Sequence, residues 1–300
     1  MARCAFLFPG QGGQFVGQGR DFLTKEPLFA DLFQKAEAIS KLPLKEISLN
    51  GPLDELNKPS FLQPAILTLS LALAKTLEKE GATPLIAAGH SLGEYGALAL
   101  AGALTDEEAL ALVSARGRFC EKAAASRPGA MAAILNVSGE ETAKLCDLAL
   151  AVGEVAPANF NTPTQTVVSG EVKAVSAVVR YAEMKNGKAL ILPITGAYHS
   201  PLMADAAKDM RELILATDFK KPRLPVVPNA IGQAESDPGR LKELLMEQLT
   251  APVHWVQTSA SLLAANPEEF VECWPKLYVG SLVKKCLPKD ALIPFRVLKA

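Results

Sequence analysis

Short apolar runs along the chain alternate with longer segments in which apolar positions recur at helical spacing. The runs CAFLF at residues 4–8 and LIAAG at residues 85–89 are followed by helical patterns at residues 23–40 and 92–104, respectively. A further apolar run at residues 225–227 begins the same alternation near the carboxyl end. Strands that are buried on both faces lose the period-two alternation of half-exposed strands, so these runs predict a mostly parallel sheet covered by helices. The predicted fold class is α/β.

The pattern changes between residues 128 and 196. Here the predicted elements follow the order strand, helix, two strands, helix and strand, which is the split βαβ arrangement of a ferredoxin-like unit. We expect this segment, 128–196, to be a smaller subdomain inserted into a larger one that comprises residues 1–127 and 197–300. A cleft between two such units is the natural place for a ligand.

Residues 89–95, GHSLGEY, lie where a predicted buried strand turns into a helix. A G-x-S-x-G sequence in this context is the nucleophile elbow, in which a strained turn exposes the serine hydroxyl at the edge of the sheet. Glycines flank Ser91 because larger side chains there would collide with neighbouring backbone. The alternative is a glycine-rich turn whose serine only caps the helix. The elbow makes the larger subdomain α/β-hydrolase-like, with Ser91 as the candidate nucleophile.

A serine nucleophile needs a base, and the chain has three histidines, at positions 90, 199 and 254. His90 is adjacent to Ser91, and in a tight turn we expect its ring to point away from the hydroxyl. His199 lies in the segment GAYHSP, where the predicted insertion rejoins the larger subdomain, as expected of a site residue. A lone loop histidine is more often structural, but beside an elbow serine His199 is the candidate base. We expect His254 to be structural.

Attack on a carbonyl group needs two N–H donors for the oxygen of the tetrahedral intermediate. The elbow supplies the first donor through the main chain of Leu92. The first predicted strand ends in PGQGGQ at residues 9–14, a turn that can bring the Gln11 main chain to the same site. Neither G-x-x-x-x-G-K-[ST] nor G-x-G-x-x-G occurs in this turn, so we do not interpret it as a phosphate-binding loop.

The overall composition restricts the classes of partner. The 31 basic and 32 acidic residues leave a formal net charge of −1, which does not favour nucleic acid or a membrane surface as partner. The five cysteines form no C-x-x-C pair, which argues against a metal cage and for reduced thiols in a cytoplasmic protein. No window approaches the roughly 18 uninterrupted apolar residues of a membrane span. The richest run is at residues 96–104.

Six short motifs occur in order along the chain: PGQGGQ, GHSLGEY, SARGRF, ANFNTPTQ, GAYHSPLM and QLTAPVHW. Together they resemble the malonyl-CoA:acyl carrier protein transacylases of bacterial type II fatty-acid synthesis, from residue 5 to about residue 285. The resemblance implies that Ser91 is the nucleophile, His199 its base, and Gln11 and Leu92 the frame of the oxyanion hole. It also implies transfer of a malonyl group from malonyl-CoA to the phosphopantetheine thiol of acyl carrier protein, through a malonyl-serine intermediate and without a cofactor.

The same resemblance assigns roles to four further residues. Arg116, in SARGRF, is implied to bind the free malonyl carboxylate, which a guanidinium meets with two parallel hydrogen bonds. Gln248 matches the family's glutamine, which orients the histidine through a carbonyl oxygen in place of the usual carboxylate. Asn159 matches an asparagine of the pocket. Tyr198 is bulky and narrows the space beside the malonyl α-carbon, which favours malonyl over methylmalonyl groups.

The helix that carries Arg116 has a clear predicted start. Thr105 and Glu108 have the spacing of a capping box, which satisfies two main-chain donors at a helix amino terminus. A single arginine on a helix usually lies on a solvated face, whereas the proposed site requires the Arg116 side chain to point inward. It requires the hydroxyl of Ser91, the ring of His199 and the guanidinium of Arg116 to converge on one dry cavity, which we expect to be about the size of a three-carbon diacid.

The chain departs from the family pattern at two places. Where the family usually has Gly-Pro-Gly after the last strand, this chain has Trp274, Pro275 and Lys276, and neither tryptophan nor lysine shares glycine's freedom at positive φ. We therefore expect an altered turn there, and with it an altered surface toward the carrier protein. Cys120 stands where many relatives have methionine, which predicts a modest change in the shape of the pocket.

Other functions are compatible with parts of the pattern. A serine esterase or thioesterase would use the same elbow with water as acceptor, but no acid is evidently placed to complete its triad. A stand-alone polyketide acyltransferase would transfer the same group in another pathway, and a carrier-docking module would need no nucleophile. We expect a monomer that binds CoA thioesters and acyl carrier protein. Basic residues that could attract an acidic carrier are Lys220, Lys221, Arg223, Lys284 and Lys285.

Overall fold

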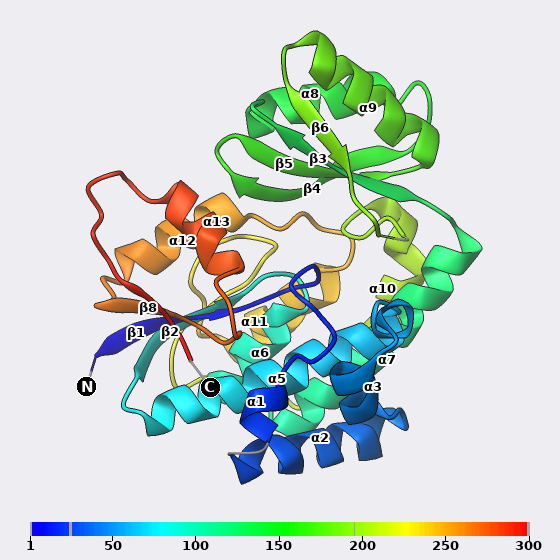
Figure 1. Ribbon diagram of the computed structural model, residues 1–300. Coiled ribbons are helices and arrows are strands. Elements are labelled where there is room, and N and C mark those ends of the chain that lie inside the picture. The colour runs from blue at the N-terminus through cyan, green and yellow to red at the C-terminus, as the bar shows by residue number, and fades with distance from the viewer. Residues whose placement is uncertain (1, 24–25, 195, 299–300) are drawn as a thin grey trace.

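The computed structural model describes residues 2–23, 26–194 and 196–298, and within these residues the strands form two sheets (Figure 1). Positions 24–25 of the predicted helix 23–40 and Thr195 of the predicted insertion lie outside the described residues. Sheet A has the order β7-β2-β1-β8-β9, and its strands are β1 (Arg3–Phe8), β2 (Thr83–Gly89), β7 (Val226–Val227), β8 (Glu269–Glu272) and β9 (Phe295–Val297). Sheet B has the order β4-β5-β3-β6, and its strands are β3 (Ala130–Leu135), β4 (Val155–Thr162), β5 (Gln165–Gly170) and β6 (Lys188–Ile191).

Helices cover both sheets (Figure 1). Those before β3 are α1 (Arg20–Leu23), α2 (Pro27–Ser40), α3 (Leu44–Asn50), α4 (Leu53–Leu56), α5 (Pro59–Lys79), α6 (Gly93–Leu100) and α7 (Asp106–Ser126). Between the strands of sheet B lie α8 (Gly139–Ala149) and α9 (Val172–Met184). The later ones are the 3-10 helix η1 (Pro201–Met203), then α10 (Ala204–Ala216), α11 (Pro238–Glu247), α12 (Trp255–Ala264) and α13 (Val279–Cys286).

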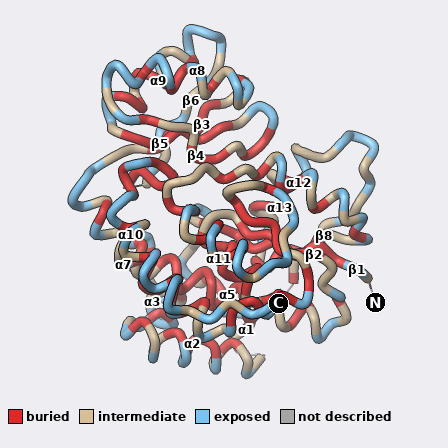
Figure 2. The backbone as a smooth tube through the Cα atoms, turned by 180° about the vertical axis from the view of Figure 1, so that it is seen from behind, coloured by how far each residue is buried: buried red, intermediate tan, exposed pale blue. Residues whose placement is uncertain are grey.

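Sheet A is parallel throughout, as the apolar runs predict. Successive side chains of its central strand β1 point to opposite faces of the sheet, and both faces are buried. Phe6 and Phe8 join the larger core, to which α2, α5, α6 and α7 contribute, whereas Ala5 and Leu7 join a second core, to which α12 and α13 contribute. Buried residues are concentrated along these inner elements, and the outer loops and helix faces are exposed (Figure 2).

Sheet B has the topology predicted for a ferredoxin-like unit. Its pairings are antiparallel, and its strand order, in which the first and third strands of the unit are central, is that of the split βαβ fold. The helices α8 and α9 cover one face, over a core that includes Ile134, Val168 and Val178. The strands and helices of this unit span 130–191, inside the predicted insertion at 128–196. The exact subdomain boundaries stay predictions.

Two details of the predicted elements are wrong. The helical pattern at 23–40 is divided into α1 and α2, and the pattern at 92–104 ends with α6 because Gly102 adopts a positive φ of 74°. By length and composition α5 alone among the described helices is long and apolar enough to cross a membrane, and 89% of its apolar window is buried in the protein, as in the core helix of a soluble protein.

Candidate active site

Ser91 occupies the predicted elbow between β2 and α6, in a strained conformation. Its φ of 52° lies in the left-handed region, which non-glycine residues seldom adopt. The two flanking glycines are required by space. A Cβ atom on Gly89 would lie 1.9 Å from the carbonyl carbon of Gly93, and a Cβ atom on Gly93 would lie 2.4 Å from the carbonyl oxygen of Phe8. The predicted elbow is therefore confirmed, and it presents the Ser91 hydroxyl at the carboxyl edge of sheet A.

The ring of His199 faces that hydroxyl. His199 Nε2 lies 2.8 Å from Ser91 Oγ, and its Nδ1 lies 3.0 Å from the main-chain carbonyl oxygens of Gln248 and Ala251. Because carbonyl oxygens only accept hydrogen bonds, Nδ1 must carry the proton and Nε2 is left to accept one from serine. Burial, and secondarily the positive charge of Arg116, lower the pKa of His199 to about 3. The imidazole is thus neutral at physiological pH, and its Nε2 is placed to accept the hydroxyl proton.

Arg116 completes the group of three. Its side chain is 1% exposed, and its Nη2 donates to Ser91 Oγ at 3.0 Å. Nη1 donates to Oε1 of Gln63, which the buried helix α5 presents, at 2.8 Å. The guanidinium therefore does not lie on a solvated helix face but beside the serine hydroxyl. A buried cation in this position suits a ligand that carries a carboxylate.

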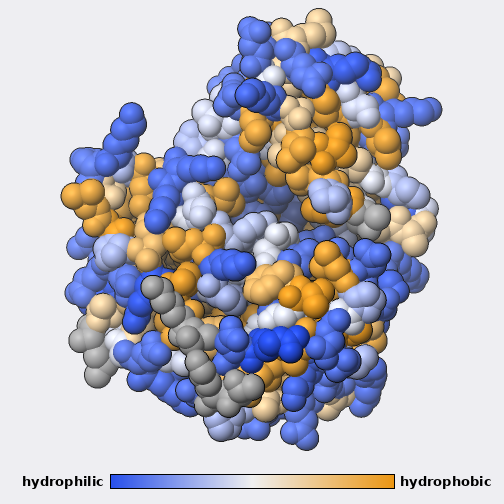
Figure 3. Space-filling model, viewed as in Figure 1, coloured by the Kyte–Doolittle hydropathy of each residue, from blue (hydrophilic) through white to orange (hydrophobic). Residues whose placement is uncertain are grey.

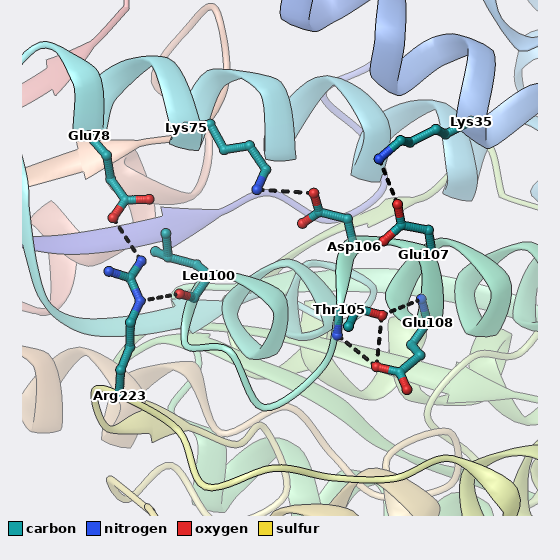
Figure 4. A network of polar contacts seen from close by, with 9 residues as sticks. All are labelled: Lys35, Lys75, Glu78, Leu100, Thr105, Asp106, Glu107, Glu108 and Arg223. Atoms are coloured by element: carbon teal, nitrogen blue, oxygen red, sulfur yellow. Dashed lines mark hydrogen bonds and ion pairs between the residues drawn. The ribbon is translucent and has the colours of Figure 1, made fainter.

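The amino terminus of α7, which carries Arg116, is held in place by polar contacts (Figure 4). Thr105 and Glu108 form the predicted capping box, with Thr105 N donating to Glu108 Oε2 at 2.7 Å and Glu108 N donating to Thr105 Oγ1 at 3.1 Å. The first two residues of the helix form ion pairs with neighbouring helices. Asp106 pairs with Lys75 of α5 at 3.0 Å, and Glu107 pairs with Lys35 of α2 at 2.6 Å.

The predicted oxyanion donors are the main-chain N–H groups of Gln11 and Leu92. Gln11 and Leu92 both line the cavity that contains Ser91. In the part of the chain that the structure describes, neither of their main-chain N–H groups has a hydrogen-bond acceptor. Two unpaired donors beside a nucleophile are the arrangement that an oxyanion hole requires.

The loop that carries Gln11 is fixed by the segment that follows β8. Tyr278 Oη donates to the Gln11 carbonyl oxygen at 3.0 Å, and Trp274 Nε1 donates to the Gly13 carbonyl oxygen at 3.2 Å. Whether Trp274 and Lys276 alter this turn relative to the family stays a prediction. No residue from 274 to 276 has a positive φ, so the bend forms without the conformation that only glycine adopts easily. The tryptophan instead contributes a hydrogen bond.

One cavity of about 950 Å³ connects these groups, and in the space-filling view this face is hollowed between the two parts of the molecule (Figure 3). It is lined by Ser91, His199 and Arg116 from the larger part and by β3, β4 and β5 of sheet B. Asn159 and Tyr198 also line it, as predicted. The cavity is much larger than a three-carbon diacid, so the predicted size is wrong. The additional volume suits the long arm of a thioester substrate.

The remaining sequence predictions near the site have simple outcomes. The His90 ring points away from the serine hydroxyl, as predicted, with Nε2 2.9 Å from Asn161 Oδ1. His254 stacks on Phe160 outside the cavity lining, with ring centroids 5.4 Å apart. Cys120 is fully buried one helical turn after Arg116, on the same helix.

The basic residues expected to attract an acidic carrier lie outside the cavity lining, and their contact with a carrier stays a prediction. The lysines and arginine at 220, 221, 223, 284 and 285 are absent from the described lining residues, whereas Lys58 lines the cavity beside Asp54. Arg223 is instead paired with Glu78 at 2.7 Å and donates to the Leu100 carbonyl oxygen at 2.9 Å (Figure 4).

Several residues of the site were not predicted from the sequence. Asn229 accepts a hydrogen bond from Ser91 N at 2.6 Å, and Glu94 accepts one from the Gln248 side chain at 2.8 Å. Gln63 supports Arg116, as described above. The sequence contained a signal for two of these residues, Asn229 and Glu94. Asn229 follows β7 at the carboxyl edge of a parallel sheet, where ligand sites occur, and Glu94 lies within the GHSLGEY motif.

Comparison with known proteins agrees with this geometry. The family model described as acyl transferase domain matches residues 5–290. The malonyl CoA-acyl carrier protein transacylases of Bacillus subtilis strain 168 and Escherichia coli K12 are 37% and 36% identical to this chain over 287 residues, which are 95% of the chain and 90% and 93% of those proteins.

Solved structures agree as well. The malonyl CoA-acyl carrier protein transacylase of Coxiella burnetii is similar with a TM-score of 0.93 and 34% identity, covering 99% of this chain and 94% of that one. A malonyl-transacylase solved in complex with a type II PKS acyl-carrier protein is similar with a TM-score of 0.93 and 30% identity, covering 99% of this chain and 96% of that one.

Proposed function

The chain belongs to the acyl transferase domain family, and we propose that it transfers the malonyl group of malonyl-CoA to the phosphopantetheine thiol of acyl carrier protein. The observation that carries this proposal is the convergence of three groups. Ser91 Oγ lies 2.8 Å from a neutral imidazole and 3.0 Å from a buried guanidinium. The first pair supplies an activated nucleophile, and the guanidinium selects an acyl group that has its own carboxylate.

The proposed reaction has two half-reactions of the same kind. Ser91 Oγ attacks the thioester carbonyl carbon while His199 Nε2 takes the hydroxyl proton, and the N–H groups of Gln11 and Leu92 bind the oxyanion. When the C–S bond breaks, His199 returns that proton to the CoA sulfur. The malonyl-serine oxyester is then attacked by the carrier's thiol, whose proton passes through His199 back to Ser91 Oγ. Each step is acyl exchange, so no cofactor is required.

Arg116 distinguishes malonyl from acetyl groups in this proposal. An acetyl thioester would leave the buried guanidinium without a carboxylate partner, whereas malonyl would form paired hydrogen bonds with it. Tyr198 narrows the cavity beside the acyl α-carbon and favours malonyl over methylmalonyl. Asn159 lines the same cavity from β4 and is proposed to contact the substrate.

The decisive test is mass spectrometry of the intact protein after exposure to malonyl-CoA, followed by peptide mapping. We expect one malonyl group on the Ser91 peptide and none in Ser91→Ala. Arg116→Ala should acylate from malonyl-CoA more slowly by a factor on the order of 10², because its carboxylate loses a buried partner. Arg118→Ala is the matched control, since Arg118 is exposed on the same helix, and it should behave as the parent protein. A malonyl group elsewhere than on Ser91 would refute the mechanism.

A thioesterase is the second candidate and is disfavoured by one observation. His199 Nδ1 faces two carbonyl oxygens and no carboxylate, so the acid of a hydrolase triad is absent from the described surroundings of the ring. The test is the product: a thioesterase would release free malonate from malonyl-CoA without carrier protein, whereas a transferase should retain the group until the carrier's thiol is added.

We propose that the pathway served is fatty-acid synthesis, with stand-alone polyketide synthesis as the alternative. Comparing transfer rates to carrier proteins of the two pathways would separate them. We further propose a cytoplasmic monomer. The five cysteines are all free, which suits a reducing compartment. Sedimentation at working concentration tests the monomer.

A further inference from the structure

Glu94 is a buried carboxyl group behind the nucleophile that the proposed reaction does not use. It lies on the first turn of α6 and is 1% exposed. Its Oε2 accepts two hydrogen bonds, from Gln248 Nε2 at 2.8 Å and from Asn229 N at 3.0 Å. A buried carboxylate is costly unless its partners are well placed, so these two contacts call for an explanation.

The first partner, Asn229, holds both arms of the elbow. Its Oδ1 accepts from Ser91 N at 2.6 Å, and its Nδ2 donates to the Gly89 carbonyl oxygen at 2.6 Å. One side chain thus fixes the residue before the turn and the strained residue within it. Since Ser91 adopts a positive φ, the surrounding contacts must maintain that conformation.

The second partner, Gln248, touches all three groups of the proposed site. Its Nε2 donates to the Ser91 carbonyl oxygen at 3.0 Å, and its Oε1 accepts from Arg116 Nη2 at 3.3 Å. Its main-chain carbonyl oxygen accepts from His199 Nδ1. The orientation of the Gln248 amide is determined by Glu94, because a carboxylate accepts only from the NH2 end and thereby turns the carbonyl end toward Arg116.

We propose that Glu94 is a positioning residue of the acyl transfer. Through Asn229 and Gln248 it keeps the side chains of Ser91, His199 and Arg116 aligned with one another. This inference rests on the proposed function. Without the carboxylate, two buried donors lose their acceptor at once, and the Gln248 amide is free to turn over. The reacting groups would still be present but less well aligned, and such misplacement lowers the rate of the chemical step more than the binding of substrate.

The experiment compares Glu94→Gln with Glu94→Leu. The amide of Gln keeps an acceptor oxygen, whereas Leu removes it at similar volume. Single-turnover release of CoA from malonyl-CoA measures the acylation rate and the half-saturating concentration. We expect Glu94→Leu to lower the acylation rate by about 10²-fold with less than a threefold change in half-saturating concentration, and Glu94→Gln to recover most of the rate. Leu98→Ala, in the buried face of the same helix, controls for lost stability and should keep the parent rate.

If Glu94→Leu does not fold, Asn229→Ala tests the next link. It keeps the main-chain N–H that donates to Glu94 but removes the side-chain bonds to Ser91 N and to the Gly89 carbonyl oxygen, and it should show the same loss of rate without loss of binding. A folded Glu94→Leu or Asn229→Ala that acylates within threefold of the parent overturns the proposal. So does a Glu94→Gln that is as slow as Glu94→Leu, because the acceptor oxygen would then not be what matters. These outcomes differ from failure of the proposed function, in which the parent protein itself would carry no malonyl group on Ser91.

Discussion

Two buried carboxyl groups lie near the site: Glu94 on the helix that follows the elbow, and Glu272 at the end of β8. Their exposed fractions are 1% and 0%. Burial, only partly offset by hydrogen bonds, raises the pKa of each carboxyl group to about 7. By burial and pKa alone the two are indistinguishable.

Their partners distinguish them. Glu94 bonds to the side chain of Gln248 and the main chain of Asn229, and both of these residues contact reacting groups. Glu272 accepts from three consecutive main-chain N–H groups, those of Tyr278, Val279 and Gly280, at 2.9 to 3.0 Å. These are the unpaired donors at the start of α13, so Glu272 caps a helix. The comparison teaches that a shifted pKa indicates burial, and that only the partners indicate the role.

Replacing Glu272 by Leu should produce the largest effect on stability. The substitution leaves the donors at the start of α13 without an acceptor, which should lower the free energy of unfolding by about 3 kcal/mol or more. The acylation rate per folded molecule should fall by less than tenfold, the reverse of the pattern expected for Glu94→Leu. Urea unfolding and single-turnover acylation measure the two quantities. Equal losses of rate in both variants would remove the distinction.

Glu272→Gln should change the pH dependence of stability. A carboxyl group whose folded pKa is near 7 and whose unfolded pKa is near 4.5 stabilises the protein most below about pH 4.5, and that stabilisation is lost as the pH rises through 7. A glutamine does not titrate. Relative to the parent, the variant should therefore gain about 3 kcal/mol of unfolding free energy between pH 4.5 and pH 8. Parallel stability curves for the two proteins would show that Glu272 does not titrate in this range.

Tyr278→Phe tests whether the segment that follows Glu272 affects the acylation rate. It removes the single hydrogen bond to the Gln11 carbonyl oxygen and keeps the ring. A bond worth about 1 kcal/mol that aligns an oxyanion donor corresponds to a three- to tenfold lower acylation rate. Stability should change by no more than about 1 kcal/mol. An unchanged rate in single-turnover assays would mean that the loop is held sufficiently by Trp274.

Lys276→Ala should produce the smallest effect. The Lys276 ammonium lies 4.6 Å from the centre of the Phe15 ring, in a contact worth about 0.5 kcal/mol at an exposed site. We expect a shift of that size in urea unfolding and no change in acylation rate. A loss of rate would show that this part of the turn, which differs from the family pattern, acts on the site after all.

Features that depend on adjacent residues could be predicted from the sequence. The elbow at Ser91 requires two glycines and a strand-to-helix turn within five residues, and the capping box requires only Thr105 and Glu108. Likewise, the alternation of apolar runs and helical patterns was sufficient to predict a parallel sheet. Each of these rests on local backbone geometry and short-range contacts, which the order of residues encodes directly.

Contacts between distant segments could not be predicted in this way. Gln248 was expected to orient His199 through a carbonyl oxygen, but nothing in the sequence shows that the oxygen is that of the main chain, that Ala251 supplies a second, or that the Gln248 side chain turns instead to Glu94. The sequence also did not show that the turn at 274–276 forms without a positive φ, or that Trp274 donates to the Gly13 carbonyl oxygen.

By itself, therefore, the sequence determined the elbow, the helix start that leads to Arg116, the class of fold and the resemblance to a family. The tertiary structure alone decided which carbonyl oxygens face His199, which side chains hold the elbow from behind, and how large the cavity is. The physical reason is that a hydrogen bond depends on distance and angle between two groups. For groups that are more than a hundred residues apart in the chain, such as Ser91 and Asn229, packing of whole elements sets both quantities.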